Sequence, residues 1–106
     1  FLSYSVDDNS TYECMKFYYN NLKYIMDPHT AVAANAVTKL ETELRKKTII
    51  LSTAHPAKFP LPLKNAGINL KDIPKNLEKV MNKKEVSFKL STSDNSIFEF
   101  IKENNQ

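Results

Sequence analysis

The sequence predicts an α/β fold that is mostly helical, with one or two short strands. Apolar side chains in the first quarter of the chain recur at helical spacing, and Met15 and Leu22 fall on one face of such a helix. A continuous apolar run over residues 48–51 has instead the length and composition of a buried strand. The chain of 106 residues contains no internal repeat or low-complexity tract. We therefore expect a single unit over residues 1–106.

The first predicted helix covers residues 11–23. Ser10 and Glu13 have the spacing of a capping box, in which the two side chains satisfy free amides at the helix start. An apolar stripe follows at three- and four-residue spacing, which is what burial of one helix face requires. The stripe consists of Met15, Tyr18, Tyr19 and Leu22. We interpret it as core, in preference to a ligand platform.

A second helix is predicted over residues 28–45. Asp27 can cap its first amides, and Pro28 suits the first helical position, where a missing N–H costs nothing. The early face of this helix carries only small side chains, so another group can approach its backbone closely. These side chains are Ala31, Ala33, Ala34 and Ala36. The residues favour a neighbouring helix as that group and leave a cofactor ring as the alternative.

The run over residues 48–51 predicts a strand buried on both faces, as in a parallel sheet, which one strand cannot form alone. Beyond it, Pro56, Pro60 and Pro62 limit any helix to short pieces, and Gly67 suits a helix stop.

The remaining third of the chain is simpler. Residues 65–74 form a predicted connector, and a helix is expected near residues 74–81. Apolar and polar side chains alternate over residues 86–90, which indicates a second strand, and a final helix is expected with Ser93 as its cap.

Composition excludes several classes of function. Fifteen basic and twelve acidic residues give a net charge of +3, and the two signs are interspersed, which is typical of a solvated surface and not of a nucleic-acid interface. The single cysteine, Cys14, excludes an internal disulfide and so favours a cytoplasmic protein. We expect its side chain to be buried and inert. No apolar run is long enough to cross a membrane. Gly67 is the only glycine, so no glycine-rich loop can hold a phosphate.

Two segments carry the functional signal: residues 24–32 (YIMDPHTAV) and residues 52–60 (STAHPAKFP). Each lies where one predicted element meets the next. Together, over residues 24–60, they resemble the carboxy-terminal part of the threonine synthase family of fold type II pyridoxal-phosphate enzymes. The resemblance implies a lyase that converts O-phospho-L-homoserine and water into L-threonine and phosphate. Because the chain begins with Phe1, we expect a fragment that is inactive alone and that packs against the rest of its parent chain.

The resemblance assigns one cofactor contact, Thr53. In the family a Ser or Thr hydroxyl at the matching position donates a hydrogen bond to the ring nitrogen of pyridoxal phosphate. A hydroxyl can do this without keeping the nitrogen permanently protonated, whereas a carboxylate would favour the protonated ring. Without the resemblance, Thr53 is a threonine at the end of a strand.

Three further residues are candidates for contact with substrate or for lining the pocket: His55, Lys58 and His29. Each histidine also fits a helix start, where a polar side chain satisfies free amides. Lys58 can equally stabilise the loop after the strand. No cysteine or carboxylate cluster accompanies the histidines, so we predict no metal site.

We assign no catalytic residue to this chain. The sequence Ser87-Phe88-Lys89 superficially resembles the segment that carries the family's Schiff-base lysine. It follows the two segments, however, whereas the family's lysine precedes them, and Leu90 stands in place of an aspartate.

Two other hypotheses stay open: a related fold type II enzyme such as a threonine or serine dehydratase, and a non-catalytic interaction domain. A strand with unpaired edges also predicts self-association.

Overall fold

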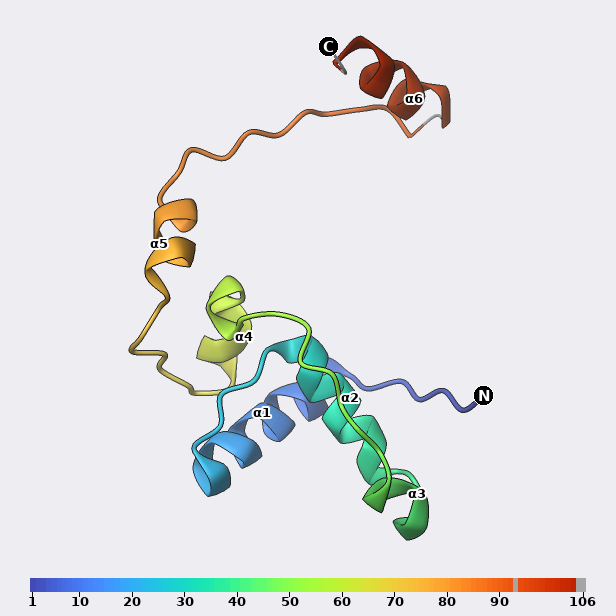
Figure 1. The fold of residues 1–106 in the computed structure, drawn as a ribbon, viewed down its shortest axis with the longest axis vertical. Helices are drawn as coiled ribbons and strands as arrows, with labels where there is room; N and C mark the ends of the chain where they lie inside the picture. Colours follow the sequence, from blue (N-terminus) through green and yellow to red (C-terminus); the bar gives the residue numbers. More distant parts are fainter. Residues whose placement is uncertain (93, 105–106) are drawn as a thin grey trace. The chain divides into compact units, whose positions relative to one another are not determined.

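The computed structural model describes residues 1–92 and 94–104 (Figure 1). The chain divides into two units, Phe1–Ile73 (unit 1) and Pro74–Gln106 (unit 2). Unit 1 contains α1 (Asp8–Leu22), α2 (Pro28–Thr38), α3 (Thr42–Lys46), the 3-10 turn η1 (Pro56–Lys58) and α4 (Pro60–Asn65). Unit 2 contains α5 (Lys75–Met81) and α6 (Asp94–Glu103). That both units belong to one catalytic domain stays a prediction.

The fold is mostly helical, as predicted, but the two expected strands are not strands in the described residues. Residues 48–51 are extended, and Ile49 and Leu51 are 87% and 75% exposed. Residues 86–90 are likewise extended and exposed. A strand is stabilised by hydrogen bonds to a neighbouring strand. The described residues provide no such neighbour, so both apolar runs lie unpaired.

Helix α1 begins earlier than predicted. Its cap is Asp7, whose Oδ1 accepts a hydrogen bond from the Ser10 amide at 2.8 Å, so Ser10 lies in the first turn and does not cap the helix. The helix ends at Leu22, and Lys23 after it adopts the left-handed conformation with φ of 54°. The Tyr24 amide then donates to the Tyr18 carbonyl, so the chain turns sharply towards α2.

Helix α2 starts as predicted, with Asp27 as its cap and Pro28 in its first turn, but it ends at Thr38 and not at residue 45. The Arg45 guanidinium caps this end. It donates hydrogen bonds to the carbonyls of Thr38 at 2.7 Å and Leu40 at 3.1 Å, which would otherwise have no partner at the helix end. Helix α3 then continues as a separate turn.

The core of unit 1 forms where α1 packs on α2, with α4 against α1. Met15 and Ala31 are fully buried and Ala34 is 2% exposed, so part of the small face of α2 is covered by a neighbouring helix, the alternative that the residues favoured. Leu22 does not join this core, because it is 65% exposed. The buried cluster comprises Cys14, Met15, Met26, Ala31, Ala34, Leu63, Ala66 and Ile68.

The proline-rich stretch forms only short helices, as predicted, and Gly67 ends the last of them. Gly67 has φ of 68°, a conformation that strains any residue with a Cβ atom. The Ile68 amide donates to the Leu63 carbonyl at 2.9 Å, and both of these side chains are buried. This arrangement is a Schellman motif, and it joins the end of α4 to the core.

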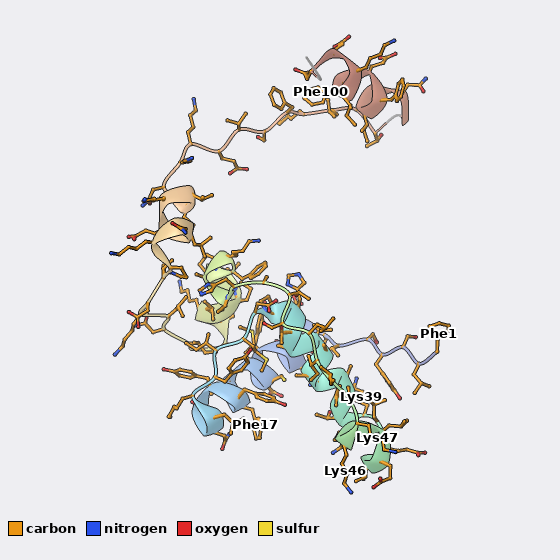
Figure 2. All side chains as sticks on the ribbon, viewed as in Figure 1. Phe1, Phe17, Lys39, Lys46, Lys47 and Phe100 are labelled. Atoms are coloured by element: carbon orange, nitrogen blue, oxygen red, sulfur yellow. The ribbon has the colours of Figure 1, made fainter. Side chains whose placement is uncertain are left out.

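In unit 2, α5 begins directly after Pro74, as predicted. Helix α6 is also present, but Ser93, its predicted cap, lies outside the described residues. The Phe100 ring of α6 packs on Phe88 with ring centroids 5.0 Å apart (Figure 2). Three other large side chains of α6 are mostly exposed: Ile97, Phe98 and Ile101.

Candidate functional site

Thr53 lies in the segment that joins α3 to η1. Its side chain is exposed, and its hydroxyl has no hydrogen-bond partner within the part of the chain that the structure describes. A hydroxyl without a partner can donate to an aromatic nitrogen of a ligand. Thr53 therefore presents a hydroxyl donor at the surface of the described residues.

His55 caps η1. Its Nδ1 accepts a hydrogen bond from the Ala57 amide at 3.2 Å, and Ala57 itself is only 3% exposed. Lys58 is exposed, and its amide donates to the His55 carbonyl at 3.1 Å. The structure thus places His55 at a helix start, one of the two positions expected for it, and leaves the imidazole and the Lys58 ammonium at the surface.

The start of α2 is organised around the carboxylate of Asp27, which is fully buried. Oδ1 accepts hydrogen bonds from the amides of His29 at 3.0 Å and Thr30 at 3.3 Å, and Nδ1 of His29 lies 3.1 Å from the same oxygen. The Thr30 hydroxyl donates to Oδ2. Burial acts to raise the pKa of Asp27, but the hydrogen bonds from Thr30 and His29 outweigh it and hold the pKa below its ordinary value.

These contacts limit what the helix start can bind. Free amides at a helix N-terminus can hold a phosphate, but in α2 Asp27 already accepts from the amides of His29 and Thr30. Nδ1 of His29 is engaged by the same carboxylate. The α2 N-terminus is therefore closed by the chain itself and is a poor site for an anionic ligand.

The two sequence segments contact each other through a pair of rings. The His29 ring lies edge-on to the ring of Phe59, with centroids 5.0 Å apart and an interplanar angle of 63°. Phe59 follows η1 directly and precedes α4, so the contact holds the end of the second segment against the start of α2. Sequence reasoning missed Phe59, whose only signal was its position inside the second segment.

Two cavities of unit 1 lie away from these residues. One, of about 420 Å³, is lined by Asn9, Tyr12, Glu13, Lys16, Lys64, Asn65, Ala66 and Gly67. The other, of about 340 Å³, is lined by Leu2, Tyr4, Ala36, Val37, Leu40, Leu44 and Thr48. Neither involves a predicted site residue.

Other kinds of site find no support in the described part of the chain. Among residues 1–92 and 94–104, no group of three or more His, Cys, Asp or Glu side chains could hold a metal ion. No described helix has both the length and the apolar character needed to cross a bilayer. Cys14 is buried, and burial raises the pKa of its thiol, which makes it a poor nucleophile, as expected.

A protein-family profile described as "Threonine synthase, C-terminal" matches residues 30–101. The chain belongs to this family. The match starts inside the first segment and continues well beyond residue 60, where the resemblance carried by the two segments ends. It includes parts of both units, so the threonine synthase relationship is not restricted to the surroundings of Thr53.

Curated relatives agree with this assignment. The chain is 37% identical to the threonine synthase of Pseudomonas aeruginosa over 68 residues, which cover 64% of this chain and 14% of the relative. It is 42% identical to that of Saccharomyces cerevisiae over 73 residues, 62% of this chain and 14% of the relative. It is 44% identical to the threonine synthase of Schizosaccharomyces pombe over 68 residues, which cover 56% of this chain and 12% of the relative. The chain thus spans about one seventh of the relatives' length, and no solved structure matches it significantly.

Proposed function

We propose that the chain is the carboxy-terminal part of a pyridoxal-phosphate-dependent threonine synthase, which converts O-phospho-L-homoserine and water into L-threonine and phosphate. The observation that carries this proposal is the family match over residues 30–101. The chain spans only 14% of its relatives in Pseudomonas and Saccharomyces. We therefore assign the cofactor-binding lysine and the phosphate-binding loop to the rest of the parent chain, and we expect this chain to be inactive alone.

Within that enzyme, Thr53 is the residue that we assign to the cofactor. Bound pyridoxal phosphate supplies an electron sink for negative charge that develops on the substrate. The Thr53 hydroxyl would donate a hydrogen bond to the ring nitrogen and so orient the ring. The hydroxyl is exposed and has no partner in the described residues, which supports this role. His55 and Lys58 lie close to it in sequence, are also exposed, and stay candidates for contact with the substrate phosphate.

The rest of the parent chain is also the partner that we propose for the exposed apolar segment. Ile49 and Leu51 are 87% and 75% exposed, and the backbone of residues 49–54 makes no hydrogen bond within the described residues. Both properties are those of a strand without its sheet. Pairing with the parent's sheet would bury both side chains and bring Thr53 to a strand end. A cytoplasmic location, expected from the single cysteine, belongs to the same proposal.

A chimaeric enzyme tests the function. This chain would replace the matching part of the Saccharomyces cerevisiae threonine synthase, and the purified protein would be assayed for phosphate release from O-phospho-L-homoserine. We expect phosphate and threonine in equal amounts. A folded chimaera that instead deaminates threonine or serine would favour the dehydratase alternative. One that folds but has neither activity would contradict the proposal and favour a non-catalytic domain.

A further inference from the structure

We propose that Asp27 and His29 are positioning residues: through Phe59 they fix the loop that carries Thr53. This inference rests on the proposed function, because Thr53 matters for catalysis only if it contacts the cofactor. It assigns a role to Asp27 and Phe59, and it makes His29 a support of the site and not a substrate ligand.

The loop that carries Thr53 has little order of its own. The backbone of residues 49–54 makes no hydrogen bond within the described residues, and the Thr53 side chain is exposed. Before Thr53, the chain is held at Ile50, which packs against the core cluster of unit 1. One anchor alone would leave a long extended segment free to move, so the position of Thr53 depends on a second anchor.

The second anchor lies at η1 and Phe59. Ala57 is 3% exposed, and His55 accepts a hydrogen bond from the Ala57 amide. The Phe59 amide donates to the Pro56 carbonyl at 2.9 Å, so the ring of Phe59 and the short turn move together. The edge-to-face contact with His29 joins this turn to α2, while α4, which follows Phe59, contacts η1 and packs on α1.

Asp27 determines where the His29 ring lies. The His29 side chain is 64% exposed, and a surface histidine without a partner can sample several rotamers. Here Nδ1 of His29 lies 3.1 Å from Oδ1 of the buried Asp27 carboxylate, whose own position is fixed by hydrogen bonds from Thr30. The rigid cap therefore holds the imidazole, the imidazole holds Phe59, and Phe59 holds the loop.

Asp27 is also the cap of α2, and two substitutions separate its roles. Asp27→Ser keeps a good helix cap but is too short to reach Nδ1 of His29. Asp27→Asn keeps both the cap and an oxygen that can accept from Nδ1–H. If Asp27 acts only as a cap, the two variants behave alike. If it positions His29, Asp27→Asn retains the order of the loop and Asp27→Ser does not.

The test measures the backbone order parameter of Thr53 and Ala54 by ¹⁵N relaxation in the full 106-residue chain. In the unaltered chain we expect a value of about 0.8, and we expect it to fall below about 0.6 in His29→Ala and in Asp27→Ser. Asp27→Asn should keep the unaltered value. Phe59→Leu should lower the value as His29→Ala does, because it removes the ring and keeps an apolar side chain. Phe17→Leu is the matched control, since Phe17 is 60% exposed on α1 (Figure 2) and pairs with its neighbour Tyr18.

An order parameter that stays unchanged in both His29→Ala and Phe59→Leu would overturn the inference, and so would a value already below 0.6 in the unaltered chain. Equal values in Asp27→Ser and Asp27→Asn would remove Asp27 from the proposal. None of these outcomes depends on catalysis. The inference and the proposed function can therefore fail separately, because the chimaera tests only the function.

Discussion

Asp27→Ala should be among the most destabilising single substitutions in unit 1. The carboxylate is fully buried and accepts hydrogen bonds from the amides of His29 and Thr30 and from the Thr30 hydroxyl. Loss of a helix cap costs about 0.5–2 kcal/mol. Thr30 is only 5% exposed, so its hydroxyl would lose its partner in a place that water reaches poorly, which adds about 1–3 kcal/mol. We expect a total loss of about 1.5–5 kcal/mol in the free energy of unfolding, a large fraction of the stability of a small domain.

Urea unfolding followed by tyrosine fluorescence measures this loss. The five tyrosines all lie at or before residue 24 and there is no tryptophan, so the signal reports unit 1 alone. Asp7→Ala is the matched control, because Asp7 caps α1 in the same way but is exposed, and it should lower stability less. If Asp27→Ala and Asp7→Ala cost the same, the buried hydrogen bonds of Asp27 contribute nothing beyond a surface cap, and our account of the α2 start is wrong.

Three further predictions concern stability and assembly. The pKa of Asp27 lies below its ordinary value of 3.8 in the folded chain, so the unfolded chain binds the proton more readily. Unit 1 should therefore lose stability as the pH falls below about 4. Urea unfolding at each pH should show a smaller loss of stability in Asp27→Asn. Gly67→Ala should lower the free energy of unfolding by about 1 kcal/mol in the same assay. The cause is the φ of 68° alone, since no atom lies within 4 Å of the added Cβ. An unchanged unfolding midpoint would argue against the Schellman motif. Ile49→Ser combined with Leu51→Ser should change stability by less than about 0.5 kcal/mol and reduce self-association in light scattering; an unaltered chain that stays monomeric at every concentration would refute the association.

Features set by neighbouring residues could be predicted from the sequence. Asp27 and Pro28 fixed the start of α2, because a cap and a first-turn proline act within a few residues. Gly67 ended α4 for an equally local reason, since only glycine adopts a positive φ without strain. The start of α1 was misplaced because two caps compete there, and the Asp7 side chain, not Ser10, accepts the hydrogen bond.

Features that depend on distant partners could not be predicted in this way. The apolar run over residues 48–51 has the composition of a strand, but a strand also needs a neighbour, and the described residues contain none. The Arg45 guanidinium caps the end of α2 with a hydrogen bond that its sequence position does not determine. The contact between His29 and Phe59 joins residues far apart in the chain, so the predicted site contained one partner and missed the other.

We propose that this chain supplies the Thr53 side of a threonine synthase active site, and phosphate release by the chimaera is the sharpest test of that proposal. Thr53→Ser keeps the hydroxyl, whereas Thr53→Val keeps the shape and removes the donor. We predict that the serine variant retains most of the activity on O-phospho-L-homoserine. The valine variant should lose about 10-fold or more, because the ring nitrogen loses its partner. A valine variant as active as the unaltered chimaera would contradict the account.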